Sequence, residues 1–170
     1  MAQIATQVDP ESIPTSIFRA YDIRGIAEQQ LTSQNVKRIG QALGSEALDQ
    51  NITSLLVGYD GRLSSPALSI ALIEGIRSSG CSAVSIGLVP TPLLYFATYA
   101  TDYASGVMLT ASHNPANYNG LKIVFNQTSL AENQIQKIRT RSENDQLRTG
   151  SGKFSELEVD RSYIDDICTR

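Results

Sequence analysis

The stretch GVMLTASHNPANYNGLKIVF, residues 106–125, decides which kind of sheet this chain can form. Its two ends, GVMLT (106–110) and GLKIVF (120–125), are apolar runs typical of buried strands, and polar residues dominate the segment between them. Parallel neighbours need a crossover of about a dozen residues or more, and this segment is shorter. The two strands are therefore either antiparallel or not adjacent, and a mixed sheet is expected.

Strand-like and helical segments alternate along the rest of the chain. Strands are expected within 16–25, 53–62 and 81–87, and helices within 31–50, 64–80, 90–100, 159–170 and around Ile135 and Ile138. Such alternation places helices on both faces of one sheet. The sequence thus predicts the α/β class, with three α/β/α layers and a mixed, mostly parallel sheet.

Local signals mark the ends of several of these segments. Gly25 is expected to end the first strand in a turn, and Gly80 to end the second helix. Residues able to cap a helix N-terminus precede three helical segments: Thr32 or Ser33, Ser64 or Ser65 ahead of Pro66, and the capping-box pair Ser129 and Glu132.

The composition narrows the class of protein. The 170 residues suffice for one domain with its own core, and 41% of them are apolar. A net charge of -3 without a basic tract argues against nucleic-acid binding. No apolar run is long enough to cross a membrane and the N-terminus does not resemble a secretory signal, so a cytoplasmic location is expected. Cys81 and Cys168 are interpreted as free thiols.

Three polar loops follow predicted strands, at 22–25, 59–65 and 110–120. Ligands bind at the carboxyl ends of strands in such folds. The last loop contains Ser112 beside His113, the only histidine of the chain. A serine-hydrolase triad is disfavoured, because adjacent side chains point apart in most backbone conformations and the histidine of a triad reaches the serine from elsewhere in the chain.

A phosphate carried on Ser112 fits this loop better. Between Thr110 and Lys122 there is no Asp or Glu, so nothing in the loop repels the charge of a phosphoserine, about -1.5 to -2 at neutral pH. Arg24 and Arg62 lie in the other two polar loops. Purely structural alternatives stay open: the Asn-Pro and Asn-Gly pairs make turns, Lys122 is an edge-strand lysine, and Arg24 pairs with Asp22.

Four blocks of sequence, in this order, carry a resemblance to a known family. They are IFRAYDIRG (17–25), VGYDGRLSSP (57–66), GLVPTPLLYFAT (87–98) and TASHNPANYNGLKIV (110–124). Together they resemble the α-D-phosphohexomutases, and among these the bacterial phosphomannomutase/phosphoglucomutase branch. The resemblance covers about residues 16–170. It implies an N-terminal arm at 1–15, a first domain with the serine loop at 16–155, and at 156–170 the start of a linker helix towards an absent second domain.

The resemblance also implies an activity. Such an enzyme interconverts hexose 6-phosphate and hexose 1-phosphate, of mannose, glucose or both, through a 1,6-bisphosphate, and Ser112 would carry the phosphate. The expected partners are hexose phosphates and the remaining domains of the same enzyme. Because those domains are missing, the isolated chain is expected to be inactive. The alternative is a non-catalytic remnant of the same fold that binds a phosphosugar or another anion.

Residue roles follow from the same resemblance. The implied catalytic residues are Ser112, Lys122, Arg24 and His113, and the implied substrate-binding residues are Tyr21, Asn114 and Arg62. One Mg²⁺ ion would bind Ser112 through its phosphate, with its other ligands in the second domain. Glucose 1,6-bisphosphate or mannose 1,6-bisphosphate would act as activator.

Overall fold

The computed structural model describes residues 13–169. Residues 1–12, which include most of the expected arm and the stretch examined for a secretory signal, lie outside the described residues. The helices are η1 (Thr15–Ile17), α1 (Ser33–Asp49), α2 (Ser65–Ser78), α3 (Thr91–Ala100), α4 (Asn133–Glu143) and α5 (Asp160–Thr169). The strands are β1 (Ile23–Ile26), β2 (Ser54–Tyr59), β3 (Ser82–Leu88), β4 (Gly106–Leu109), β5 (Tyr118–Phe125), β6 (Thr128–Ser129) and β7 (Phe154–Glu156).

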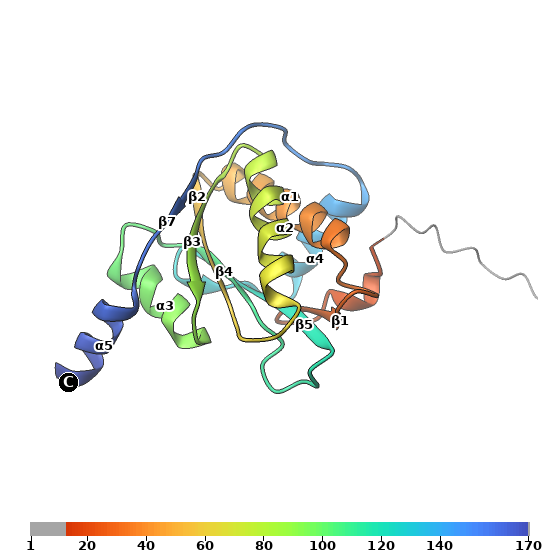
Figure 1. Cartoon of the computed structure of the whole chain (residues 1–170). Coiled ribbons are helices and arrows are strands. Elements are labelled where there is room, and N and C mark those ends of the chain that lie inside the picture. Colours follow the sequence, from red (N-terminus) through yellow and green to blue (C-terminus); the bar gives the residue numbers. More distant parts are fainter. Residues whose placement is uncertain (1–12, 170) are drawn as a thin grey trace, which may run out of the picture.

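The seven strands of the described residues form one mixed sheet, in the order β1-β5-β4-β2-β3-β7 (Figure 1). The short strand β6 pairs with β5. The short link at 110–117 does join antiparallel neighbours, β4 and β5. Strands β1 and β6 are also antiparallel to β5, whereas β2, β3 and β7 run parallel to β4. Strand β5 is thus the one described strand that runs against the others, and the predicted mixed, mostly parallel sheet is confirmed.

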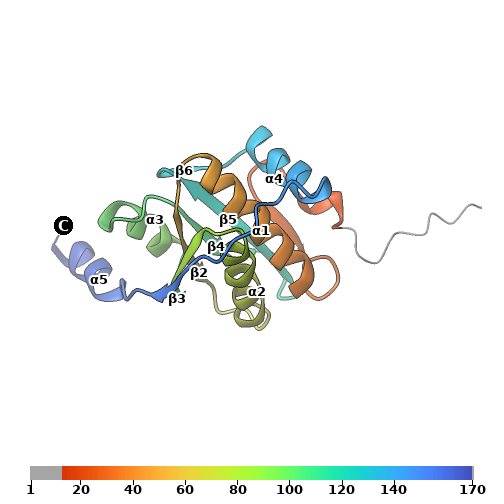
Figure 2. The ribbon, with the colours of Figure 1, turned by 90° about the horizontal axis from the view of Figure 1, so that it is seen from above.

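Helices cover both faces of the sheet and bury a separate apolar core on each (Figure 2). On one face, Leu43 of α1, Leu72 of α2 and Ile135 of α4 share a core with inward side chains of the strands. On the other face, Leu94 of α3 packs with Met108 of β4. The three-layer α/β/α architecture is therefore as predicted. Within residues 13–169 no helix combines the length and the apolar character needed to cross a membrane.

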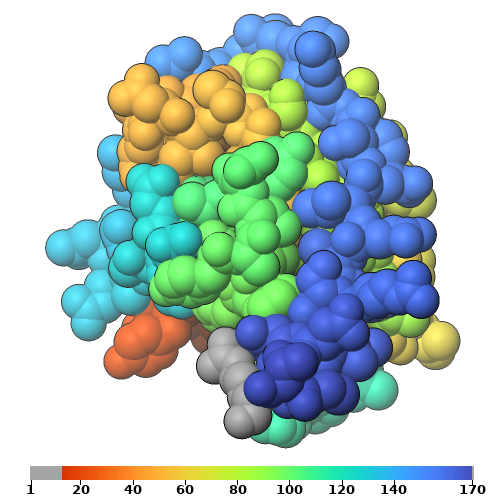
Figure 3. Space-filling view, turned by 90° about the vertical axis from the view of Figure 1, so that its left-hand side faces the viewer, coloured from red at the N-terminus to blue at the C-terminus, as the bar shows by residue number. Residues whose placement is uncertain are grey.

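Helix α5 lies beside α3 (Figure 3). The rings of Phe96 in α3 and Tyr163 in α5 meet edge to face, with centroids 5.3 Å apart. No residue of α5 itself is buried, and Ile164 and Ile167 are exposed. The expected helix at the C-terminal end is thus present, held to the body by its first turns.

Two of the predicted helix signals are confirmed. The Thr32 Oγ1 atom accepts a hydrogen bond from the N–H of Asn35 at 3.1 Å and caps α1. Gly80 follows the end of α2 with a φ of +98°, the left-handed conformation that glycine adopts readily.

Other local signals were wrong. Ser129 lies in β6, so it cannot form a capping box with Glu132, whose side chain makes no cap hydrogen bond either. Ser64 precedes α2 without capping it. Gly25 lies inside β1 rather than in a turn after it. The local preference of these residues favours a cap or a turn, but strand pairing or a contact with another loop overrides it.

An ion-pair cluster ties α4 and the segment after it to α1. The Glu46 carboxylate, 3% exposed, accepts hydrogen bonds from Lys137 at 2.6 Å and Arg141 at 3.0 Å. Asp49 pairs with Arg141 and Arg148. Burial by itself raises the pKa of Asp49, but hydrogen bonds from Arg148 and then Arg141 outweigh it, so the pKa lies below its ordinary value.

Candidate active site

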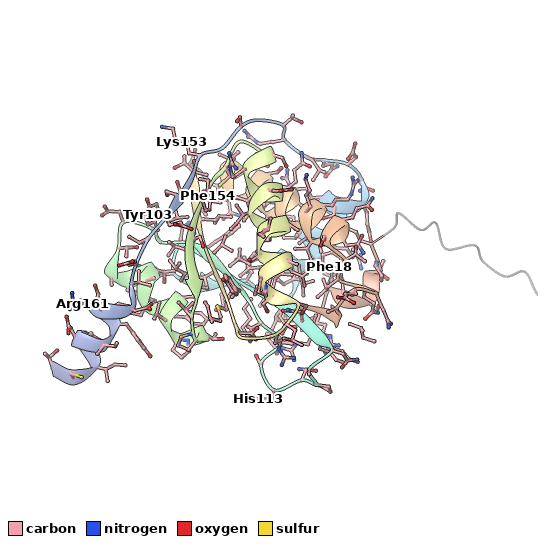
Figure 4. All side chains as sticks on the ribbon, in the orientation of Figure 1. Phe18, Tyr103, His113, Lys153, Phe154 and Arg161 are labelled. Atoms are coloured by element: carbon pink, nitrogen blue, oxygen red, sulfur yellow. The ribbon has the colours of Figure 1, made fainter. Side chains whose placement is uncertain are left out.

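Ser112 lies in the loop between β4 and β5, at the carboxyl end of β4. Its side chain is exposed, and its φ of +53° is in the left-handed region. That conformation costs a residue other than glycine about 1–2 kcal/mol, so surrounding contacts must hold it. His113 is exposed at the tip of the same loop, away from the body of the domain (Figure 4).

Arg62, from the loop between β2 and α2, braces the serine loop. Its Nη1 atom donates to the carbonyl oxygens of Pro115 at 2.6 Å and Tyr118 at 3.1 Å. Its Nη2 atom donates to the carbonyl oxygens of Ser112 at 2.9 Å and Asn114 at 2.8 Å. The guanidinium therefore grips the backbone on both sides of the loop, a use that its planar fork of donors suits.

Asp60 is the centre of these contacts. Its Oδ1 atom accepts hydrogen bonds from the Ser65 hydroxyl at 2.7 Å and the Arg62 N–H at 3.2 Å. Its Oδ2 atom accepts from the Thr110 hydroxyl at 2.8 Å and from Arg62 Nε at 3.3 Å. The Thr110 hydroxyl oxygen in turn accepts the N–H of Ser112 at 3.0 Å. One carboxylate thereby links the two loops.

Asn119 and Gly120 belong to β5, not to a turn. The buried side chain of Asn119 donates to the hydroxyls of Ser64 and Ser65, at 2.9 and 3.0 Å. Gly120 lies between β1 and β4, where a Cβ atom would come within 2.5 Å of the carbonyl oxygen of Ile23. The Asn-Gly pair thus serves close strand packing and an inter-loop contact rather than turn formation.

Two of the predicted cations lie on one face of the sheet beside this loop. Arg24 pairs with Gly120 across β1 and β5, and Lys122 is two residues further along β5, so their side chains share a face. Lys122 pairs with Met108, which packs against α3, so this is the α3 side of the sheet. Both cations are partly buried.

The two cations differ in their partners. Arg24 forms an ion pair with Asp22, as the purely structural alternative predicts. Its Nε atom is nevertheless buried without a hydrogen-bond partner among the described residues. For Lys122, residues 13–169 supply neither a hydrogen bond nor an ion pair. The ammonium group of Lys122 is thus not engaged by the described residues, and its binding of an anion stays a prediction.

The other predicted site residues lie around the loop. Tyr21 is 72% exposed just before β1. The Asn114 side chain donates to the carbonyl oxygen of Ala111 at 2.9 Å and closes a turn within the loop. Arg62, predicted to bind substrate, has its guanidinium engaged by the loop. The structure brings the serine, the loop residues and the cations to one end of the sheet, and their chemical roles stay predictions.

A hollow of about 490 Å³ opens beside the loop. Residues from both loops line it: Asp60, Gly61, Arg62, Leu63, Asn114 and Ala116. In the described part of the chain, no three His, Cys, Asp or Glu side chains gather in a way that suits a metal ion. The described residues therefore do not form a Mg²⁺ site by themselves.

Sequence reasoning missed the supporting residues Asp60, Thr110 and Asn119. The signal for Asp60 was present, because the polar stretch 59–65 follows a buried strand at the same edge as the serine loop. No local pattern reveals which of its side chains reaches which atom of the other loop. That depends on the register of β2 beside β4, which only the folded sheet fixes.

The fold and the site define a class of protein: an α/β/α domain that presents a strained serine loop, with cations nearby, at the carboxyl edge of its sheet. The model of one family, described as phosphoglucomutase/phosphomannomutase, alpha/beta/alpha domain I, matches residues 15–149. The chain belongs to this family and represents its domain I.

Relatives agree with this assignment. A phosphomannomutase/phosphoglucomutase of Pseudomonas aeruginosa is 46% identical over 156 residues, 92% of this chain and 34% of that protein. A phosphoglucomutase of Neisseria meningitidis is 39% identical over 158 residues, also 92% of this chain and 34% of that protein. The crystal structure of a family protein from Burkholderia thailandensis superposes with a TM-score of 0.90 at 37% identity, over 93% of this chain and 36% of that one. The chain thus spans about a third of the curated relatives it matches.

Proposed function

We propose that this chain is the phosphoserine-bearing domain of a hexose-phosphate mutase acting on mannose phosphates, glucose phosphates or both. In the first step, a hydroxyl of a hexose monophosphate attacks the phosphorus on Ser112. The bond from phosphorus to Ser112 Oγ breaks, the proton of the sugar hydroxyl ends on Ser112 Oγ, and a hexose 1,6-bisphosphate results. In the second step, the serine hydroxyl takes the other phosphate back, so that the phosphate has moved between C1 and C6.

The observation that carries this proposal is the presentation of Ser112. Its hydroxyl is exposed in a left-handed backbone conformation, on a loop without acidic residues, at the end of the sheet that also carries Arg24 and Lys122. These cations would stabilise the charge of the transferring phosphoryl group. Lys122 or His113 would assist proton transfer or orient the sugar hydroxyl. Tyr21 would face the sugar, and Asn114 would shape the serine loop.

The proposal includes a division of labour with parts of the enzyme beyond these 170 residues. A cytoplasmic location fits the free thiols of Cys81 and Cys168. The metal, Mg²⁺, would bind the phosphate on Ser112 and would need carboxylates supplied from elsewhere. With one wall of the cleft present, water competes with sugar for the phosphoserine. We therefore expect the chain alone to show no measurable mutase activity, and turnover near or above about 1 s⁻¹ would contradict this.

A fusion enzyme tests the function directly. Residues 1–170 are joined to the part of the Pseudomonas aeruginosa relative that follows its matched third. After incubation with radiolabelled glucose 1,6-bisphosphate, peptide mapping by mass spectrometry locates the label. We expect label on Ser112 and interconversion of glucose 6-phosphate and glucose 1-phosphate.

Two variants make the test specific. Ser112→Ala should lose both label and turnover, whereas Ser129→Ala, which removes an exposed serine of β6, should keep both. Label that persists in the Ser112→Ala enzyme would refute the assignment. Binding of hexose phosphate without label or turnover would favour the non-catalytic remnant instead.

A further inference from the structure

The N–H of Ser112 has a specific acceptor two residues back along the chain. It donates to Thr110 Oγ1 at 3.0 Å, and the Thr110 side chain is buried. The same hydroxyl lies 2.8 Å from Asp60 Oδ2. The hydroxyl of Thr110 thus stands between a carboxylate from one loop and the backbone of the proposed phosphate carrier in the other.

The chemistry of these groups fixes the direction of both hydrogen bonds. An ionised carboxylate only accepts, so the proton of the Thr110 hydroxyl points to Asp60. A lone pair of the same oxygen is then left to face the N–H of Ser112. Asp60 in turn is held by hydrogen bonds from Ser65 and from two groups of Arg62, so it has little freedom to turn away.

We propose that Thr110, oriented by Asp60, is a positioning residue that holds the backbone of Ser112 in its left-handed conformation and so aims the serine hydroxyl. The inference rests on the proposed function, in which Ser112 receives and gives phosphate. It predicts an effect on the rate of phosphoryl transfer rather than on the affinity for the bisphosphate, because Thr110 is buried and does not line the hollow beside the loop. A misplacement of about 1 Å can reduce such a rate about 100-fold.

The chain itself allows a test that needs no activity. Amide hydrogen exchange is followed by NMR in the unaltered chain and in the matched variants Thr110→Val and Thr110→Ser. Valine keeps the branched shape without the hydroxyl, and serine keeps the hydroxyl. We expect the N–H of Ser112 to exchange at least about tenfold faster in Thr110→Val and within about threefold of the original rate in Thr110→Ser. Equal protection in all three proteins would overturn the proposed contact.

The fusion enzyme then tests the consequence. Thr110→Val should lower kcat for phosphorylation of Ser112 by about 10- to 100-fold with KM changed by less than about threefold, and Thr110→Ser should restore it. Asp60→Asn, which keeps the size of the side chain, should lower kcat in the same way and serves if Thr110→Val does not fold. A folded Thr110→Val or Asp60→Asn enzyme with unchanged kcat, or an equal loss in Thr110→Ser, would refute the positioning role. If the unaltered fusion enzyme is never phosphorylated, the proposed function fails, while the exchange measurement still judges the contact.

Discussion

Replacing Arg62 with lysine should loosen the serine loop and lower the stability of the whole domain. The guanidinium donates to four backbone carbonyl groups and to Asp60, and its side chain is only 13% exposed. Lysine keeps the positive charge but offers a compact ammonium group on a flexible stem. It can satisfy some of the carbonyl groups, not all of them at once.

The size of the effect follows from the contacts that are lost. An ammonium group placed near the loop can reach about two of the four carbonyl groups, because these lie on both sides of a fork. Two hydrogen bonds from a charged donor are then missing, each contributing about 1.5–3 kcal/mol. Taking the lower figure because part of the group meets solvent, the free energy of unfolding falls by about 3 kcal/mol. For a domain of this size that corresponds to a fall in Tm of about 6–12 °C.

Thermal unfolding followed by circular dichroism measures this change, and amide exchange of Ser112 and Tyr118 shows whether the loop opens. Arg77→Lys is the matched control, since Arg77 donates one hydrogen bond, to the carbonyl oxygen of Gly152 at 3.0 Å, at the other end of the domain. Because the ammonium group of lysine can still donate a single hydrogen bond there, Arg77→Lys should lower the free energy of unfolding by about 1 kcal/mol or less. If Arg62→Lys leaves Tm and loop exchange unchanged and only raises KM in the fusion enzyme, Arg62 binds substrate, as the family resemblance implies, and the bracing argument is wrong.

Three further outcomes are expected. Lys122→Met should change the free energy of unfolding by less than about 1 kcal/mol, because Lys122 has no partner among the described residues. The same variant should lower turnover of the fusion enzyme by orders of magnitude, and unchanged turnover would leave Lys122 an ordinary strand lysine. The pKa of Asp49 is held below its ordinary value of 3.8, so its pairing stabilises the fold above that pH and is lost as the pH falls through the folded-state pKa. Urea unfolding at a series of acid pH values should show a smaller fall in the free energy of unfolding for Asp49→Asn. An unaltered fall would contradict the pairing. Burial raises the pKa of Cys81 to about 12, so at about pH 8 the native chain should show one thiol reactive towards DTNB, exposed Cys168, and two in denaturant.

The architecture was predictable because it depends on patterns that are local in the sequence. Two such patterns each exclude most alternative architectures: the apolar spacing of α1 and α2, and the short link between β4 and β5. The edge strands β6 and β7 were not predicted. Each has two or three exposed residues and is a strand only because a neighbour offers unpaired backbone groups.

The sequence predicts which residue types gather at the serine loop, but it does not predict the contacts among them. An acid-free loop with serine, histidine and lysine indicates an anion, and that much lies in the sequence between Thr110 and Lys122. Whether Arg62 meets a ligand or the loop backbone depends on the distance between two loops that lie 50 residues apart in the chain. The amino-acid composition does not determine that distance, because the parallel pairing of β2 with β4 sets it.

The hydrogen bonds described above hold the serine loop with groups of this chain alone. The side chains that hold the loop, those of Asp60, Arg62, Thr110 and Asn119, come from within residues 60–120 of this chain. The backbone adds one contact from outside that range, since the N–H of Ala27 donates to the carbonyl oxygen of Asn117 at 2.8 Å. The left-handed conformation of Ser112 is therefore held without any ligand, which is what electrostatic preorganisation would require under the proposed function. Lys122 differs, since no described group occupies its ammonium, and under the proposed function its partner would be the phosphate of the substrate. Under that function, the phosphate carrier would be held in place by its own domain and completed by what binds to it.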